Sequence, residues 1–173
     1  MKSILIAVIT ILLVYQTHAS SVFCLESDEE LLVVKSTAWM SADGYFLING
    51  RGVSKRAFRI GYNKRVKWTS KYGSVTFNQV AQDMPNGGMN EKGLVIEVTS
   101  NRHITSQEGK GRKISEIQWV QYNLDMYSTV EEVIEGLEAL KIKQIGKGLV
   151  YFLCDPTGDK AVVEIFNGQL KIY

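Results

Sequence analysis

Apolar and polar residues alternate in short runs along the first half of the chain, a pattern typical of strands separated by turns. The apolar runs are rich in β-branched and aromatic residues, and Gly, Asn, Asp and Lys lie between them. A turn is expected at residues 86–93, since the adjacent Gly87 and Gly88 allow backbone angles that other residues avoid. The predicted strands cover residues 31–34, 45–48, 57–60, 74–77 and 94–98.

The period then becomes helical. Ser115, with Gln118 three residues later, has the spacing of a reciprocal N-terminal cap, and residues 128–131 repeat that signal. Behind each cap, apolar residues recur three or four positions apart, as on one face of a helix. These positions are 117, 120 and 124 in the first segment and 133, 134 and 137 in the second. Two helices in series are predicted.

Strands return at the end of the chain, at residues 149–154, 161–166 and 169–173. Residues 155–158 form the first turn between them, and Asn167–Gly168 forms the second. The Asn-Gly dipeptide favours a tight hairpin of the last two strands. The order of strands, two helices and strands indicates the α+β class.

The first nineteen residues have the features of a secretory signal peptide. Lys2 supplies a positive charge, the stretch 4–15 is apolar apart from one threonine, and Thr17 and Ala19 are small residues at the positions inspected before cleavage. The apolar stretch is too short to span a bilayer, which needs about twenty residues. Cleavage after Ala19 is expected to leave residues 20–173 as one domain that is secreted or periplasmic and no longer held by a membrane.

Composition narrows the classes of function. Hydrophobic residues make up 45% of the 173 positions and charged residues 22%, which is ordinary for one globular domain. The net charge is +2, and the basic residues are interpreted as spread along the chain, which argues against nucleic-acid binding. Two Cys and two His without ligand-like spacing predict no metal site, and no glycine-rich loop opens a helix, so no cofactor is expected.

Few residues offer nucleophilic chemistry. His103, the one histidine after residue 19, lies in a polar stretch and is interpreted as an exposed loop residue. Cleavage after Ala19 would give Ser20 both a hydroxyl and a free α-amine, and such an amine can act as the base for its own side chain. Cys24 and Cys154 could pair in an oxidising compartment, but two unpaired thiols that behave as small apolar side chains are favoured.

Two longer stretches carry further information: residues 68–79 read WTSKYGSVTFNQ and residues 87–97 read GGMNEKGLVIE. Together with shorter stretches in the same order, they resemble the choloylglycine hydrolase family of linear amide C–N hydrolases, which includes bile salt hydrolases and penicillin V acylases. The resemblance covers nearly all of residues 20–173. The shorter stretches are 49–57, 114–119, 128–133 and 154–155.

The resemblance implies a four-layer αββα N-terminal-nucleophile hydrolase fold and a set of site residues. Counting back from Trp39, which matches a family tryptophan, Ser20 falls on the nucleophilic cysteine and Lys35 beside it. Asn90 matches an asparagine that helps to stabilise the oxyanion, a role worth several kcal/mol in such sites. Ala38 falls where the family has a carboxylate that orients the terminal amine.

These departures, with a chain length expected to hold only the N-terminal half of the family fold, predict a degenerate linear amide hydrolase with weak or no activity. Two alternatives stay open. The chain is a non-catalytic remnant that binds an amide ligand or a partner, or it is one half of a two-chain amidase. The expected partners are accordingly a small linear amide, a second copy of the chain, or a separately encoded C-terminal half.

Overall fold

The computed structural model places the three predicted site residues and most of residues 20–173. The predicted signal peptide, Ala38 and Trp39 lie outside the described residues. In the described part, no helix is long and apolar enough to cross a membrane. The described residues are 20–27, 30–37, 43–61, 64–79, 81–101, 103–146 and 148–173.

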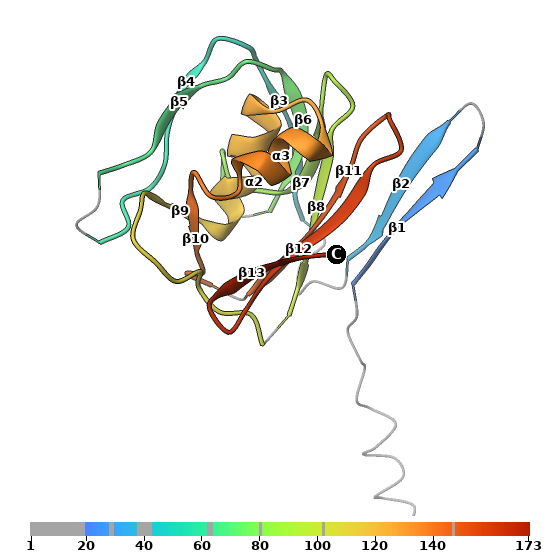
Figure 1. Cartoon of the computed structure of the whole chain (residues 1–173). Coiled ribbons are helices and arrows are strands. Elements are labelled where there is room, and N and C mark those ends of the chain that lie inside the picture. Colours follow the sequence, from blue (N-terminus) through green and yellow to red (C-terminus); the bar gives the residue numbers. More distant parts are fainter. Residues whose placement is uncertain are drawn as a thin grey trace, which may run out of the picture.

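A seven-stranded antiparallel sheet forms the centre of the fold (Figure 1). Its strand order is β13-β12-β11-β8-β7-β6-β3, so the last strands of the chain pair with the middle ones through β8 and β11. The strands are β3 (Tyr45–Asn49), β6 (Ser74–Asn78), β7 (Pro85–Asn90), β8 (Val95–Ser100), β11 (Leu149–Cys154), β12 (Lys160–Phe166) and β13 (Gln169–Ile172).

Two helices, α2 (Glu116–Met126) and α3 (Val130–Gly136), lie on one side of this sheet (Figure 1). Alternate residues of the central strands point toward them and are buried, as the period of a strand requires. The ring of Trp119 in α2 packs on that of Tyr151 in β11 with centroids 4.5 Å apart. This layer contains the hydrophobic core, and the predicted α+β class is confirmed.

Three small strand pairs complete the structure. The hairpin of β1 (Ser21–Glu26) and β2 (Leu31–Ser36) lies beside the main sheet, and β4 (Ser54–Arg56) pairs with β5 (Lys67–Thr69) in a separate arm. β9 (Lys113–Ser115) pairs in parallel with β10 (Lys141–Lys143) near the start of α2. Because Lys35 of β2 bonds to Glu97, whose neighbours Ile96 and Val98 are buried against the helices, the β1–β2 hairpin covers the sheet face opposite the helices.

Most predicted elements are present, including the final hairpin. Asn167 and Gly168 both have positive φ, at 50° and 77°, as a two-residue turn of this kind requires. The strand predicted at 57–60 is wrong, because pairing ends at Arg56 and the chain then leaves the ladder. Ala57 donates its N–H to the carbonyl oxygen of Val66, and its side chain belongs to the buried hydrophobic cluster, which explains its apolar character without a strand.

The turn predicted at 86–93 is also wrong in its first part. Gly87 and Gly88 lie inside β7, and the turn falls at residues 91–93, where Gly93 has φ +83°. A Cβ on Gly88 would lie 2.5 Å from the carbonyl oxygen of Val75, and one on Gly87 would meet the carboxylate of Glu97. The glycine pair therefore permits close approach within a strand instead of a change of direction.

Both helix caps form, with one correction. The Oγ of Ser115 accepts the N–H of Gln118 at 3.3 Å as predicted, while the Gln118 side chain accepts the N–H of Phe58. The second cap is Thr129, one residue later than the predicted Ser128, and its Oγ1 accepts the N–H of Glu132. The Glu132 carboxylate accepts hydrogen bonds from the N–H and the hydroxyl of Ser128, the residue before the cap.

Candidate active site

Ser20 directly precedes β1 and is half-buried. Side chains alternate along a strand, so Ser20, Val22 and Cys24 belong to one face of the hairpin. That face lies against the main sheet, because the sulfur of Cys24 contacts the sulfur of Cys154 in β11. The alternation of β1, continued one residue back, assigns Ser20 to the side of the hairpin that faces the sheet.

Lys35 lies on the same face of the hairpin. It pairs with Val22, two residues after Ser20, and is thus the diagonal neighbour of Ser20, a relationship that separates two residues by about 7–8 Å in antiparallel strands. Its Nζ donates to the carbonyl oxygen of Asn86 at 2.6 Å and to Oε2 of Glu97 at 2.7 Å. The position of Lys35 beside the Ser20 hydroxyl stays a prediction, and the ammonium of Lys35 is paired with a carboxylate.

Glu97 was missed by the sequence interpretation. It lies in β8, opposite Gly87 of β7, on the sheet face covered by the hairpin. Burial raises the pKa of Glu97 above its ordinary value, and the attraction and hydrogen bond of Lys35 oppose that shift. The signal was available, since Glu97 interrupts the predicted apolar strand 94–98, and a carboxylate at such a position needs a partner.

Asn90 is hydrogen-bonded to main-chain groups, and its role at an oxyanion stays a prediction. Its Nδ2 donates to the carbonyl oxygens of Leu124 at 2.9 Å and Tyr127 at 2.7 Å, at the end of α2. Its Oδ1 accepts the N–H groups of Lys92 and Leu94 in the turn between β7 and β8. The side chain is 2% exposed, and both amide hydrogens are engaged by main-chain oxygens, so in this arrangement Asn90 joins a turn to a helix.

The two cysteines are free thiols, as favoured from the sequence, although Cys24 is only half-buried. The structure also brings them together, which the sequence did not predict: Cys24 Sγ donates to Cys154 Sγ at 3.4 Å. Burial raises the pKa of the Cys154 thiol to about 12, and the contact with Cys24 adds to the shift. His103 is exposed in a loop, as expected.

A second polar cluster lies under the β4–β5 arm. The carboxylate of Asp125 in α2 is buried and accepts bonds from Trp68 at 2.6 Å, from Gln121 at 2.9 Å and from Lys55. Burial raises the pKa of Asp125 against the effect of these three donors. Since the cluster satisfies the carboxylate from three sides, it fixes the arm to α2. A pocket of about 450 Å³ beside it is lined by Ser54, Lys55, Arg56, Lys67, Trp68 and Thr69.

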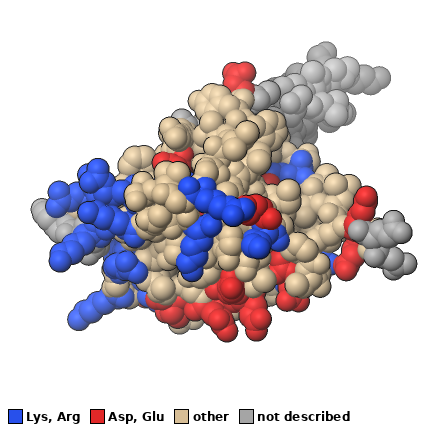
Figure 2. Space-filling model, turned by 90° about the horizontal axis from the view of Figure 1, so that it is seen from above, with Lys and Arg blue, Asp and Glu red and all other residues tan. Residues whose placement is uncertain are grey.

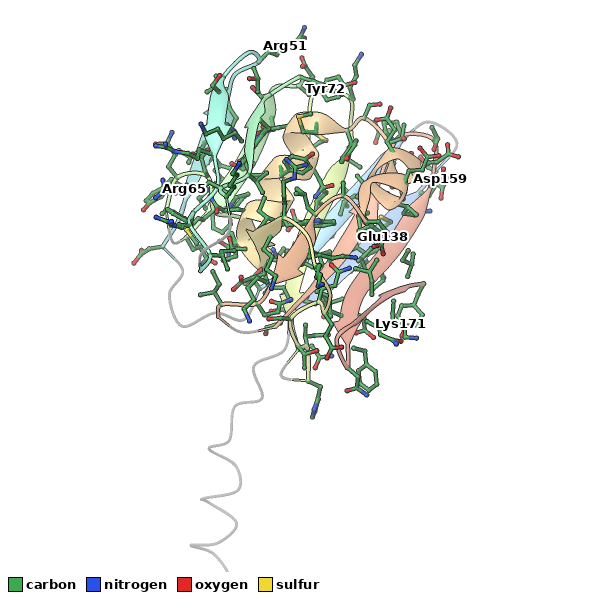
Figure 3. The ribbon with its side chains drawn as sticks, turned by 60° about the vertical axis from the view of Figure 1, so that its left-hand side comes forward. Arg51, Arg65, Tyr72, Glu138, Asp159 and Lys171 are labelled. Atoms are coloured by element: carbon green, nitrogen blue, oxygen red, sulfur yellow. The ribbon has the colours of Figure 1, made fainter. Side chains whose placement is uncertain are left out.

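The basic residues are less evenly spread than the sequence interpretation held. Residues 51–71 contain eight Lys and Arg and no Asp or Glu. In Figure 2 Lys and Arg side chains gather at one side of the molecule, and Figure 3 shows Arg51 and Arg65 on the arm. Within the described ranges, no group of three or more His, Cys, Asp or Glu is arranged to hold a metal ion.

Comparison with known proteins places this arrangement in context. The chain is 31% identical over 125 residues to a penicillin V acylase of Pectobacterium atrosepticum, covering 62% of this chain and 33% of that protein. It superimposes on penicillin V acylase from Agrobacterium tumefaciens with a TM-score of 0.74 at 30% identity, covering 89% of this chain and 48% of the other.

A mutant of the conjugated bile acid hydrolase from Clostridium perfringens gives a TM-score of 0.75 at 23% identity, over 90% of this chain and 50% of the other. These neighbours have the N-terminal-nucleophile hydrolase fold, so the predicted fold class is confirmed, and the chain spans about half of their length. Residues 29–173 match the model of the linear amide C–N hydrolases, choloylglycine hydrolase family. The chain therefore belongs to the choloylglycine hydrolase family of linear amide C–N hydrolases.

Proposed function

We propose that the chain carries a weakened linear amide hydrolase site in which Ser20, exposed as the first residue by cleavage after Ala19, is the nucleophile. The observation that carries this proposal is the position of Ser20, on the sheet-facing side of the hairpin and diagonal to Lys35. Family membership supports a linear amide as the substrate class. The signal-like sequence of residues 1–19 supports a secreted or periplasmic location.

In the proposed reaction the Oγ of Ser20 attacks the amide carbonyl carbon while the Ser20 α-amine accepts the hydroxyl proton. The C–N bond then breaks, and the amine passes that proton to the leaving nitrogen. This leaves an acyl ester on Ser20. Water, deprotonated by the same amine, attacks the ester and releases the carboxylic acid with the free serine.

The Lys35–Glu97 pair supports this chemistry through electrostatics. A positive charge near the α-amine disfavours the protonated amine, and the free base is the form that the reaction needs. Glu97 limits the effect, because its Oε2 lies 2.7 Å from Lys35 Nζ and partly neutralises that positive charge. We assign both residues as positioning residues, since Lys35 hydrogen-bonds to Glu97 and to the carbonyl oxygen of Asn86 and acts on the α-amine only through its charge.

Two features make the proposed activity weak. Position 38 holds alanine, so the carboxylate that the family resemblance implies there is missing. The amide of Asn90 would have to release Leu124 or Tyr127 before it could donate to an oxyanion. A missing oxyanion donor alone lowers turnover by about 10²–10³-fold in well-studied hydrolases.

The test has two steps. Sequencing the amino terminus of the purified exported protein should give Ser-Ser-Val-Phe, and the initial rate on a chromogenic linear amide should fall to background in Ser20→Ala. Ser21→Ala is the matched control, since Ser21 is exposed on the opposite face of the hairpin. A different first residue, or equal rates in Ser20→Ala and the unchanged protein, rules out this mechanism.

A non-catalytic role in binding a partner chain is supported by one observation. On the sheet face opposite the helices, in the part that the β1–β2 hairpin leaves exposed, the apolar side chains Ile48, Val75 and Met89 are adjacent by register. They are 88%, 47% and 52% exposed. Phe46, 76% exposed, extends this row along β3. Such a contiguous exposed apolar patch is typical of an interaction site, and a second copy of this chain could cover it symmetrically.

Light scattering after size exclusion tests the partner-binding role. We expect a dimer that Ile48→Glu converts to a monomer, whereas Ile145→Glu, at a residue 64% exposed outside the sheet, leaves the dimer intact. A two-chain amidase instead predicts a monomer that gains mass and activity only with a separately encoded chain. A monomer that gains neither contradicts both forms of the partner-binding role.

A further inference from the structure

A contact between the β1–β2 hairpin and β11 joins two thiols. Cys24 and Cys154 are 130 positions apart in the sequence, and their sulfur atoms are 3.4 Å apart. We propose that this pair is a covalent modification site, at which an intramolecular disulfide fixes the hairpin that carries Ser20 to the main sheet. The proposal is independent of whether Ser20 is a nucleophile.

The two strands direct the sulfurs toward each other. Cys24 is on the sheet-facing side of β1, and Cys154 pairs with Val95 of β8 on the sheet face that the hairpin covers. A disulfide requires sulfur atoms about 2.05 Å apart, so closing the bond needs a relative movement of about 1.4 Å. A movement of that size is within the reach of side-chain rotation and a small shift of a two-stranded hairpin.

Two ion pairs on either side of the thiols hold the hairpin in this place. Glu26, two residues after Cys24, bonds to Lys160 of β12 at 2.5 Å. On the other side, Lys35 of β2 bonds to Glu97 of β8. Contacts with three different strands of the sheet therefore fix the position of the hairpin before any covalent bond forms, which reduces the entropy lost on closing the disulfide.

The accessibility of the two thiols sets the order of reaction with a small disulfide such as oxidised glutathione. Cys24, which is half-buried, attacks first: its sulfur bonds to one glutathione sulfur, the glutathione S–S bond breaks, and one glutathione thiol leaves with the proton. The sulfur of Cys154, which is 0% exposed, then attacks Cys24 Sγ, and the second glutathione thiol leaves with its proton. Two protein thiols are oxidised and one glutathione disulfide is reduced.

The second step needs the thiolate of Cys154. Burial, Cys24 and Asp155 raise the pKa of Cys154, and the positive charge of Lys160, its partner in the β11–β12 register, acts in the opposite direction. Because the pKa of Cys154 is about 12, the thiolate is a minor species at neutral pH, and we expect the second step to become faster as the pH is raised. Once formed, the bond closes a loop of most of the chain, and a loop of that length restricts the unfolded state strongly.

Mass spectrometry and thermal unfolding test the site on the purified protein. After incubation with oxidised glutathione and alkylation without reductant, we expect a mass about 2 Da lower than that of the dithiol and a linked Cys24–Cys154 peptide. We also expect the Tm to rise by about 5–10 °C over the reduced protein. Cys24→Ser and Cys154→Ser should show no such rise.

Three results would overturn the proposal: alkylation of both thiols in folded protein after oxidation, glutathione retained on Cys24, or a bond only between molecules. Circular dichroism of the reduced variants shows whether each one is folded. If Cys154→Ser does not fold, Cys24→Ala and the peptide map of the unchanged protein still decide, because Cys24 is half-buried and its loss leaves the core intact.

Discussion

The carboxylate of Glu97 occupies the space that a side chain at Gly87 would need. The two residues are paired in the β7–β8 register, and a Cβ built on Gly87 would lie 1.9 Å from Oε2 of Glu97. The same oxygen accepts a hydrogen bond from the ammonium group of Lys35. The missing side chain at position 87 is therefore the condition for the Lys35–Glu97 pair under the hairpin.

Gly87→Ala should displace the Glu97 carboxylate from Lys35. Both charged groups would then stay half-buried without the hydrogen bond that now joins them. We expect the free energy of unfolding to fall by about 1–3 kcal/mol in urea titrations. Gly50→Ala is the control, because a Cβ there would meet only Val53 at 3.7 Å and the backbone does not have a positive φ. That variant should stay within about 0.5 kcal/mol of the unchanged protein.

The double variant Gly87→Ala/Glu97→Ala separates crowding from a general intolerance of alanine in β7. With the carboxylate removed, the new methyl group has room, so the loss should be smaller than the sum of the two single losses by about 1 kcal/mol. Additive losses in the double variant would mean that Gly87 is required for a reason other than the Glu97 side chain.

The raised pKa of Glu97 predicts the direction of a pH dependence. A carboxyl whose folded pKa lies above 4.5 is held protonated more tightly in the folded than in the unfolded state, so its ionisation lowers stability. Its contribution is fully present below pH 4.5 and is lost as the pH rises through the raised folded pKa. We therefore expect the unchanged protein to lose stability relative to Glu97→Gln as the pH rises over that interval.

Glu91→Gln provides the opposite control in the same urea titrations. The Arg51 hydrogen bond, followed by that from the Gly73 N–H, lowers the pKa of Glu91, so its contribution is lost as the pH falls through the lowered folded pKa. The two difference curves should thus slope in opposite directions. Parallel curves for the unchanged protein and Glu97→Gln would show that the Lys35 attraction balances burial.

Local sequence signals predicted the parts of the fold that depend on neighbouring residues. Ser115 begins a helix because its hydroxyl accepts an N–H three residues away, and the Asn167–Gly168 turn follows from two adjacent residues. The second cap was predicted one residue early, because Ser128 and Thr129 offer the same hydroxyl. The competing acidic partner, Glu132 instead of Glu131, decides between them.

Contacts between distant strands could not be predicted in this way. The Cys24–Cys154 contact depends on where the hairpin lies on the sheet, and no local pattern specifies that placement. Gly87 was interpreted as a turn residue, because its role depends on Glu97 in the neighbouring strand. In the candidate site, the family resemblance predicts Lys35 beside Ser20 by counting residues, whereas the carboxylate partner of Lys35 could not be predicted.

Asn90→Ala should destabilise the protein whatever its effect on hydrolysis. The change removes four hydrogen bonds and leaves the carbonyls of Leu124 and Tyr127 without that donor in a buried site, for an expected loss of about 2–4 kcal/mol. Asn101→Ala is the matched control, since its side chain accepts one N–H in an exposed loop. A loss for Asn90→Ala no larger than for Asn101→Ala would mean that the Asn90 amide is not a structural link and is free for a role in catalysis.

Ser20→Cys should not restore strong hydrolysis of a chromogenic linear amide. A thiol is the better nucleophile, but the exchange supplies neither a carboxylate at Ala38 nor a free amide at Asn90, so we expect a gain in initial rate of no more than about tenfold. Ser21→Cys is the control, because it adds a thiol one residue away on the opposite face of the hairpin. A gain of about 10³-fold or more in Ser20→Cys alone would contradict the proposed roles of Ala38 and Asn90 in weakening the site, and would indicate that the serine nucleophile limits the rate.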